Sequence, residues 1–170
     1  MIESKYNERR KETETALKLL QSRLNIQSLA DVSIAQFEQN ADLLPAVIRK
    51  RALHVVRECD RVHQAVQALK EGNMVKLGQL LNESHASLRD LFEVTGVEPD
   101  ALVAIAQSHR SCVGSRLTGG GFGGSTISIV KSDDVDDFKT SVFLNYFKTT
   151  GYMAKFYDVQ ISDGLTITKL

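Results

Sequence analysis

The residues whose types and spacing best suit ligand binding or catalysis form a glycine-rich segment, Val113 to Val130. Its sequence is VGSRLTGGGFGGSTISIV. Five of the six residues from Gly119 to Gly124 are glycine. Glycine reaches φ > 0 without steric cost and lets other groups come close to the backbone. Successive N–H groups of such a loop can form a concavity for an anionic or hydroxyl-rich ligand. Alternatively, the glycines only let the chain turn tightly against a neighbouring helix, and composition alone favours neither interpretation.

Two familiar nucleotide-binding motifs do not fit this loop. Gly119, Gly121 and Gly124 satisfy G-x-G-x-x-G, but that pattern indicates dinucleotide binding only when a helix follows and receives the pyrophosphate. Here the β-branched run Ser125 to Val130 follows, which predicts a strand. A Walker loop is excluded because no Lys-Ser/Thr pair closes the glycines. The pattern therefore predicts a strand, a glycine loop and a second strand.

The overall charge excludes several classes of partner. Lys plus Arg and Asp plus Glu both number 21, so the formal net charge is zero. Without a basic field, the chain is not expected to bind nucleic acid or an anionic membrane. Its apolar runs are far shorter than the ~20 residues that span a bilayer, and its first residues lack the apolar core of a secretory signal. We therefore expect a cytoplasmic protein.

The cysteines and histidines show no spacing typical of metal ligands. Cys59 and Cys112 lie far apart in sequence and form no C-x-x-C pair. We expect both thiols to be reduced and buried as small hydrophobic groups. No metal site is predicted from the four histidines, which are His54, His63, His85 and His109.

Helices are predicted over the first two thirds of the chain. Ser4 is expected to cap a first helix whose apolar positions run to Leu24, and the looser stretch Asn25 to Leu44 follows. Pro45 suits the first turn of a long helix that Gly72 ends. One face of this helix is predicted to be buried, at Ile48, Ala52, Val55, Cys59, Val62, Val66 and Leu69.

Two further helices are predicted before the glycine loop. The first starts at Met74 and would place His85 and Arg89 on one face, because residues four apart are neighbours on a helix. The second is short and opens at Pro99, where a proline suits the first helical turn. Both helices would lie close in sequence to the strand that leads into the loop.

The last third of the chain changes period. Ser132 is predicted to cap a helix that ends at Gly151, and Met153 to Ile161 is expected to pair with Leu165 to Lys169 in a final hairpin. These elements predict one α+β domain over residues 1–170, with helices over one face of an antiparallel sheet. Its helical part would cover about residues 1–110, and the glycine loop and the mixed part about 111–170.

The segment Gly114 to Gly124, GSRLTGGGFGG, resembles the third motif of the GHMP small-molecule kinases, and within them of the galactokinases. Eleven consecutive positions match that motif, G-S-R-[ML]-T-G-G-G-F-G-G, without a gap. Ser4 to Arg10 (SKYNERR) and Glu83 to Asp90 (ESHASLRD) are also similar to galactokinase segments and follow in the same order. The resemblance covers essentially the whole chain. It implies a ferredoxin-like α+β fold for a C-terminal domain.

The resemblance also implies that much of the chemistry lies outside this chain. Galactokinases carry an N-terminal half with a sugar-binding segment, a phosphate-binding loop and a catalytic aspartate, and none of these occurs here. The implied reaction is ATP-dependent phosphorylation of the anomeric hydroxyl of α-D-galactose, with Mg²⁺ on the phosphates. The substrates would be galactose and ATP, and the N-terminal half would be the partner. The isolated chain is expected to be inactive and to self-associate through the surface left uncovered.

Individual residues receive roles from the resemblance, but no catalytic residue is among them. Tyr6 would line the sugar pocket, and the glycine loop would approach the sugar and the terminal phosphate of ATP. The implied substrate-binding residues are Tyr6, Gly119, Gly120, Gly121, Phe122, Gly123 and Gly124, with Thr118, Arg116 and His85 as support. We assign Arg9, Arg10, Arg89 and Arg116 to structural ion pairs rather than to phosphate, with Glu8, Glu12, Glu83 and Asp90 as candidate partners.

Three alternatives share the same sequence features. One is a galactokinase-like protein that has lost catalysis and acts as a sugar-responsive regulator. Another is a GHMP kinase for a different substrate, such as N-acetylgalactosamine, mevalonate or homoserine. The third is a free-standing domain of another class that senses a small ligand through the glycine loop. An upstream phosphate loop and catalytic aspartate would distinguish the enzyme from the regulator.

Overall fold

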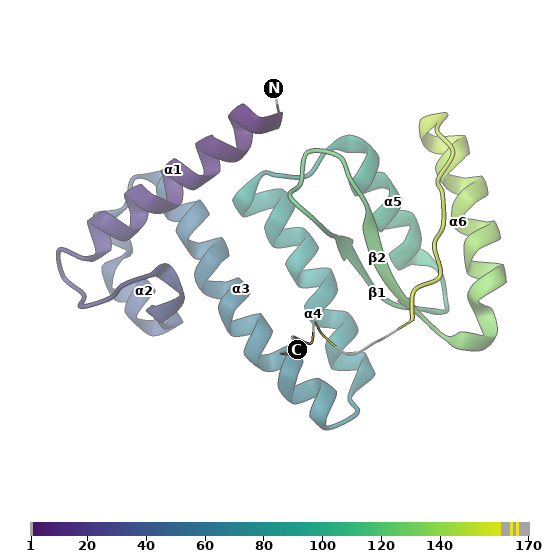
Figure 1. Cartoon of the computed structure of the whole chain (residues 1–170), viewed down its shortest axis with the longest axis horizontal. Helices are drawn as coiled ribbons and strands as arrows, with labels where there is room; N and C mark the ends of the chain where they lie inside the picture. The colour runs from purple at the N-terminus through teal and green to yellow at the C-terminus, as the bar shows by residue number, and fades with distance from the viewer. Residues whose placement is uncertain (1, 161–163, 165, 167–170) are drawn as a thin grey trace, which may run out of the picture.

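The computed structural model of the chain describes residues 2–160, 164 and 166, and the side chains from residue 5 onwards (Figure 1). Helices come first, and the strands flank the glycine loop, as the sequence predicts. The longer elements are α1 (Ile2–Leu20), α2 (Ile34–Asn40), α3 (Ala46–Lys70), α4 (Met74–Ser87), α5 (Val97–Ser108), β1 (Cys112–Leu117), β2 (Thr126–Val130) and α6 (Val135–Thr150). Short helical turns cover Leu29–Asp31, Ala41–Leu43, Leu88–Phe92 and Ser132–Asp134.

The first helices pack around a hydrophobic core of their own. α3 is the long central helix, and α1 and α2 lie against its first half (Figure 1). The stretch Asn25 to Leu44, for which no helix was predicted, contains α2. The N-cap of α2 is Ser33, which forms a capping box: the Gln36 backbone N–H donates to the Ser33 hydroxyl. The buried residues of this core include Ala16, Leu20, Phe37, Leu44, Ala52 and Val56.

The strands form a two-stranded antiparallel sheet in which Ser115 pairs with Ser128 and Leu117 with Thr126. α4 lies along the outer edge of β1 and satisfies its free N–H groups with side chains. The Ser115 N–H donates to Asn82 Oδ1 at 2.9 Å. α5 packs against β1 and against α6 (Figure 1). The α+β class with helices against an antiparallel sheet is thereby confirmed.

Contact between α4 and β1 depends on two glycines. A Cβ added to Gly78 would lie 1.9 Å from the Val113 carbonyl oxygen. A Cβ added to Gly114 would lie 2.5 Å from the Gly78 carbonyl oxygen. Because both neighbours are backbone atoms, no side-chain movement would relieve these clashes. The helix and the strand therefore meet backbone to backbone at this point.

The predicted helix ends need correction at several positions. α1 begins at Ile2, so Ser4 lies inside the helix rather than capping it, and it ends at Leu20, before Leu24. α5 begins at Val97, ahead of Pro99. Ser132 starts a 3-10 turn, and Asp134 occupies the N-cap position of α6 instead. The end of α6 at Gly151 is confirmed, with Gly151 in the left-handed conformation.

The buried face of α3 is only partly as predicted. Ala52 is fully buried, but Val62, Val66 and Leu69 are between 47% and 57% exposed. α4 packs against α3, and these periodic apolar residues of α3 nevertheless stay about half exposed. Arg51 and His54 are buried in the first half of α3 instead. Hydrophobic periodicity therefore predicted the helix but not which side is covered.

The C-terminal hairpin is not found in the described part of the chain. Residues 153–160 contain no strand, and the remaining hairpin residues lie outside the described residues, apart from 164 and 166. Phe156 nevertheless packs against the second core, which contains Ala106, Phe138 and Val142. This segment is thus attached to the second core through Phe156 and to α6 through an ion pair between Lys139 Nζ and Asp158 Oδ2 at 2.6 Å.

Every helix within the described residues is too short or too polar to pass through a membrane. Cys59 and Cys112 are unpaired thiols, and both are partly buried rather than fully enclosed. Burial raises the pKa of each thiol above its ordinary value. Both cysteines therefore stay in the protonated, weakly nucleophilic form near neutral pH.

Candidate functional site

A cavity of about 350 Å³ joins the start of the chain to the glycine loop. We call it the Tyr6 cavity. One wall is the exposed start of α1, a second is the π-helical turn Leu88–Phe92, and a third is the glycine loop. Its lining residues are Tyr6, Arg9, Arg10, Thr13, Leu88, Phe92, Val94, Gly119, Gly120 and Phe122. The fold therefore brings together four of the substrate-binding candidates, Tyr6, Gly119, Gly120 and Phe122.

The tip of the glycine loop is hydrogen-bonded to Val94, which lies two residues after the π-helical turn. The Phe122 N–H donates to the Val94 carbonyl oxygen at 2.6 Å. Phe122 has φ +58°, a conformation uncommon for a residue with a side chain. Gly121 has φ +85°, and a Cβ added there would lie 2.5 Å from the same Val94 oxygen. One glycine of the loop is thus required by packing.

Other glycines of the loop have no such contact. Among the described residues, no heavy atom beyond the two adjoining residues lies within 4 Å of the place that a Cβ would take at Gly119, Gly120 or Gly123. At the base of the loop, the Thr118 N–H donates to the Ser125 carbonyl oxygen at 2.9 Å. The loop is therefore closed at its base and pinned at its tip, with open space beside several of its glycines.

The start of α1 reaches the loop through exposed side chains. Tyr6 is 57% exposed, so its ring and hydroxyl are available to a ligand in the cavity. Lys5 Nζ lies 5.5 Å from the centre of the Phe122 ring. This distance is suited to a cation–π contact between α1 and the loop tip.

A buried polar group supports the end of β1 just before the loop. His85 Nδ1 accepts the Leu117 N–H at 3.2 Å, and its Nε2 faces Asp100 Oδ1 at 3.3 Å. Burial lowers the pKa of His85 below its ordinary value. The neutral ring can accept at Nδ1, whereas its Nε2 lies near Asp100 Oδ1 without the geometry of a hydrogen bond. Arg89 lies in the π-helical turn and is exposed, so it does not share this face with His85.

Arg116 supports the same strand end from the side of α3. Its Nε donates to the Leu117 carbonyl oxygen at 2.9 Å, and its Nη1 donates to Glu58 Oε1 at 3.0 Å. Burial alone would raise the pKa of Glu58, but hydrogen bonds from Ser84 and Arg61 outweigh it, and the pKa is lowered. Glu58 therefore stays ionised and holds Arg116 away from the cavity.

All four arginines that we assigned to structural ion pairs form them. Arg9 pairs with Glu12 and Glu8, and Arg89 with Asp90. Two partners differ from those expected: Glu14 pairs with Arg10, and Glu58 pairs with Arg116. Glu58 lies far from Arg116 in sequence, so nothing in the local pattern could have indicated this pair.

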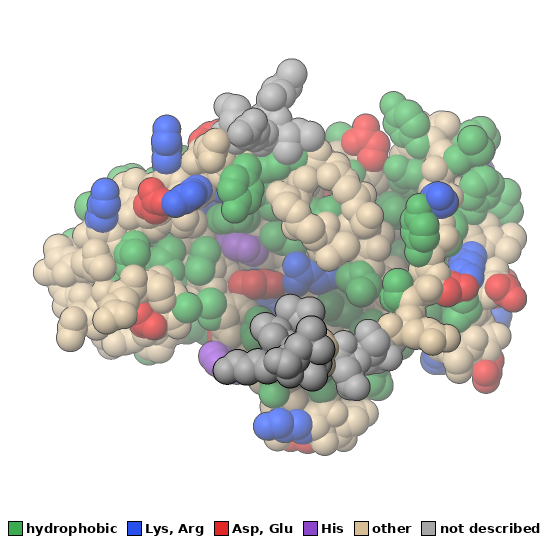
Figure 2. Space-filling model, in the orientation of Figure 1, with side chains coloured by type: hydrophobic (Ala, Val, Ile, Leu, Met, Phe, Trp, Pro, Cys, Tyr) green, Lys and Arg blue, Asp and Glu red, His purple; other side chains and the backbone are tan. Residues whose placement is uncertain are grey.

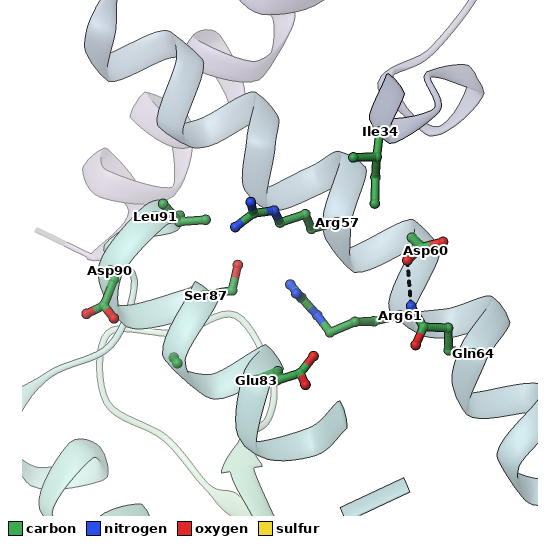
Figure 3. A pocket seen from close by; sticks show the side chains of 10 residues that line it. Ile34, Arg57, Asp60, Arg61, Gln64, Glu83, Ser87, Asp90 and Leu91 are labelled. Atoms are coloured by element: carbon green, nitrogen blue, oxygen red, sulfur yellow. Dashed lines mark hydrogen bonds between the residues drawn. The ribbon is translucent and has the colours of Figure 1, made fainter. Parts of the chain in front are cut away.

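A second, larger cavity of about 510 Å³ lies between α3 and α4 (Figure 3). Arg57 and Arg61 extend from α3 into the space that Glu83 and Ser87 of α4 also face (Figure 3). Two arginines would suit an anion, but three carboxylates share the lining, those of Asp60, Glu83 and Asp90. Arg61 also pairs with Glu58 at 2.6 Å. The cavity therefore has no net attraction for a phosphate, and the Tyr6 cavity remains the better candidate.

No sequence motif indicated the middle wall of the Tyr6 cavity. Leu88, Phe92 and Val94 were not among the candidates, because a π-helical turn inside a helical pattern has no clear sequence signature. No three His, Cys, Asp or Glu side chains of the described residues gather where they could hold a metal ion. This cavity therefore offers aromatic and backbone groups rather than metal ligands.

The fold and the glycine loop define a class of protein. The family model described as GHMP kinases C terminal matches residues 65–148, which include α4, α5, both strands and the glycine loop. Residues 65–148 therefore form a GHMP kinase C-terminal domain. The resemblance inferred from the three motifs is confirmed.

Within this family, the chain is similar to galactokinases. It is 47% identical to galactokinase from Clostridium acetobutylicum, over 96% of this chain and 42% of that relative. It is also 47% identical to galactokinase from Lactococcus lactis subsp. lactis, over 98% of this chain and 42% of the relative. The crystal structure of Lactococcus lactis galactokinase complexed with galactose matches 95% of this chain with a TM-score of 0.91 and 48% identity. The chain thus spans less than half the length of these relatives.

Proposed function

We propose that this chain is the C-terminal part of a galactokinase, which phosphorylates the anomeric hydroxyl of α-D-galactose with ATP to give galactose 1-phosphate and ADP. The main support is the Tyr6 cavity, where Tyr6 lies beside Gly119, Gly120 and Phe122. These residues come from two motifs at opposite ends of the chain that resemble galactokinase motifs. A similar solved structure is a galactokinase complexed with galactose.

Each wall of the cavity has a separate role in this proposal. Tyr6 contacts the sugar through its ring face or its hydroxyl, since an aromatic ring with a polar tip suits a molecule with both C–H and O–H groups. The open glycines let the sugar and the terminal phosphate of ATP approach the backbone closely. Phosphoryl transfer depends mainly on positioning and on stabilising charge, which backbone N–H dipoles can supply. His85, Arg116 and Thr118 hold the loop without touching substrate.

The remaining parts of the reaction come from outside this chain. The N-terminal half of the enzyme would supply the catalytic aspartate, the phosphate-binding loop and most sugar contacts. The described residues offer no metal ligand cluster, so Mg²⁺ would be held by that half and by the ATP phosphates. In this proposal, residues 1–170 form one domain of a cytoplasmic enzyme. The chain by itself neither turns over galactose nor binds ATP tightly.

An exposed apolar surface supports the idea that this chain meets a partner. Hydrophobic side chains gather over the part of the molecule that α6 forms (Figure 2). Leu144, Phe147, Tyr152 and Met153 are each at least half exposed there. Contiguous apolar surface of this kind favours association. We therefore expect the isolated chain to self-associate, and light scattering at increasing concentration would test it.

The function is tested by measuring galactose-dependent ADP formation. The chain would be assayed alone and after co-expression with the N-terminal half of Lactococcus lactis galactokinase. We expect activity only in the pair. Tyr6→Ala should raise the KM for galactose in the pair at least about tenfold, because a stacked aromatic contact is lost. Tyr157→Ala, which removes an exposed tyrosine outside the lining of the cavity, is the matched control.

Two outcomes would contradict the proposal. If the halves associate but galactose gives no ADP, the chain belongs to a kinase for another sugar or to a regulator. N-acetylgalactosamine in the same assay separates these two cases. Turnover of galactose by the isolated chain would show instead that the missing half is not required.

A further inference from the structure

Arg51 is a buried charge that the proposed reaction does not use. It lies in the first half of α3, and its side chain is only 4% exposed. It is outside the lining of the Tyr6 cavity. Burial alone would lower its pKa, but hydrogen bonds from its guanidinium to Glu93 and Glu12 outweigh this, and the pKa is raised. A charge buried in this way is costly unless each of its donors has a partner.

The guanidinium of Arg51 bonds two separate parts of the chain. Its Nε donates to Glu12 Oε2 of α1 at 3.0 Å. Its Nη1 donates to the Leu91 carbonyl oxygen at 2.6 Å, and its Nη2 donates to Glu93 Oε2 at 2.8 Å. The hydrogen bond from Arg51 keeps the pKa of Glu93 low, so this partner is ionised near neutral pH. One rigid, planar group thus links α1 to the π-helical turn.

Both ends of this link lead to a wall of the Tyr6 cavity. On the side of α1, Glu12 also pairs with Arg9, which lines the cavity one turn from Tyr6. On the other side, Leu91 and Glu93 directly precede and follow Phe92 in the sequence, and Phe92 is another lining residue. The hydrogen bonds of Arg51 therefore go to sequence neighbours of lining residues, at Glu12, Leu91 and Glu93.

The link continues from Glu93 to the glycine loop. Glu93 has φ +54°, which turns the chain so that Val94 donates its N–H back to the Leu88 carbonyl oxygen. The Val94 carbonyl oxygen then accepts the Phe122 N–H at the loop tip. A left-handed conformation at a glutamate is strained and persists only where its surroundings hold it. Arg51 bonds both the side chain of Glu93 and the carbonyl group two residues earlier.

We propose that Arg51 is a positioning residue that sets the separation between the Tyr6 wall and the glycine-loop wall of the cavity. It does so by fixing Glu12 on one side and the turn Leu91–Glu93 on the other. The identity of the ligand rests on the proposed function, but the positioning itself does not. A lysine at this position would keep the positive charge but could not bond three acceptors in a plane.

The first test measures amide hydrogen exchange in this chain without any substrate. In Arg51→Lys, the Phe122 amide should exchange about tenfold faster or more relative to buried amides of the second core such as Val142, because the turn that presents Val94 loosens. Arg57→Lys is the matched control, since Arg57 lies on the same helix but is exposed. Equal acceleration of Phe122 and of the core amides would overturn the proposal, because it would mean that Arg51 only stabilises the fold.

A second variant covers the case in which Arg51→Lys does not fold. Glu93→Gln leaves Arg51 bonded to Glu12 and to the Leu91 carbonyl oxygen while weakening the third bond. It should accelerate Phe122 exchange selectively, by a smaller factor than Arg51→Lys. Phe122 exchange at the parent rate in folded Glu93→Gln would contradict the proposed link to the loop.

The co-expressed pair offers a further measurement, the KM for galactose. This KM should not change if Arg51 only stabilises the fold. In the co-expressed pair, Arg51→Lys should raise the KM for galactose about tenfold while kcat changes less than about threefold, because the binding walls shift and the chemistry lies elsewhere. A fall in kcat at constant KM would indicate fewer folded molecules and would overturn the proposal. If the parent pair lacks galactokinase activity, the proposed function fails, and the exchange experiment still decides the role of Arg51.

Discussion

The two ends of β1 both depend on glycine, but for opposite reasons. At its start, Gly114 meets Gly78 of α4 so closely that a Cβ on either residue would overlap backbone atoms. Past its end, no heavy atom of the described residues beyond the adjoining ones lies within 4 Å of where a Cβ would lie on Gly119 or Gly120. The first pair is required by packing inside the fold, whereas the second pair leaves open space beside the Tyr6 cavity. The same residue type therefore marks a backbone contact in one region and open space beside a cavity in the other.

Gly121 lies between these two cases. It belongs to the loop, but a Cβ there would lie 2.5 Å from the Val94 carbonyl oxygen. The tight-turn interpretation of the glycine loop is thus confirmed at Gly121, and the ligand-binding interpretation stays a prediction. The loop turns tightly against a neighbouring segment at Gly121 and stays open at other glycines.

The largest effect should come from filling the contact between α4 and β1. Gly78→Ala and Gly114→Ala should each lower the free energy of unfolding by more than about 3 kcal/mol, because the clash is with backbone and the helix must move away. In an exposed helix, glycine to alanine would instead stabilise by about 1 kcal/mol. Urea unfolding followed by circular dichroism would measure the change. A stable Gly78→Ala variant would show that this contact is not the tight one we describe.

Acidification should have the next largest effect, through two buried histidines. Burial lowers the pKa of His54 from 6.5 to about 4, and burial also lowers that of His85. In the unfolded chain both rings take up a proton near pH 6.5, whereas in the fold they stay neutral to lower pH. Between these values the unfolded state binds more protons, so stability is fully present above about pH 6.5 and is lost as the pH falls. For His54 the loss reaches about 3 kcal/mol near pH 4.

The same experiment compares the two ends of β1. Protonation of His85 Nδ1 removes the acceptor of the Leu117 N–H, next to the loop, and leaves the glycine contact at Gly114 untouched. Amide exchange at Leu117 should therefore increase at mildly acidic pH before that at Ser115 does. His54→Gln should flatten the dependence of the unfolding free energy on pH, with His63→Gln as an exposed control. An unchanged pH dependence in His54→Gln would rule out His54 as its source.

The smallest effect on stability should come from the open part of the loop. Gly120→Ala should change the free energy of unfolding by less than about 1 kcal/mol, because the added methyl group meets no other part of the described chain. In the co-expressed kinase pair, the same variant should raise the KM for galactose or ATP, since the methyl group occupies the space a ligand would use. If Gly120→Ala destabilised the chain as much as Gly114→Ala, the distinction between the two ends of β1 would be lost.

Several features could be predicted from local sequence because their causes are local. The alternation around Ser115 and Ile129 predicted the strands, and β-branched residues after the glycines excluded a helix there. Gly72 and Asn73 correctly separated α3 from α4, since Gly72 adopts positive φ and Asn73 caps the next helix. The motifs also led to the family and to Tyr6 and the glycine loop as candidates.

Other features could not be predicted because they depend on contacts between distant residues. Val62 and Val66 repeat with helical period but stay exposed, since periodicity does not say what lies opposite. α2 was missed because seven residues give too short a pattern, although its capping box was present at Ser33 and Gln36. Glu58 and Arg116 pair across 58 positions of sequence, which no local rule reveals.

The sequence by itself determined the class of this protein. The glycine motif and the segments Ser4 to Arg10 and Glu83 to Asp90 have a composition and an order that few chains share. Only the tertiary structure decided which glycines are structural and which are open, because that depends on how close α4 and the turn after Leu88–Phe92 come to the backbone. The tertiary structure also brought Tyr6 to the same cavity as the loop. It placed Arg51 where its guanidinium hydrogen-bonds Glu12 of α1 and the segment Leu91–Glu93. Burial in a packed interior is a property of all neighbours together, and no single segment of the sequence contains it.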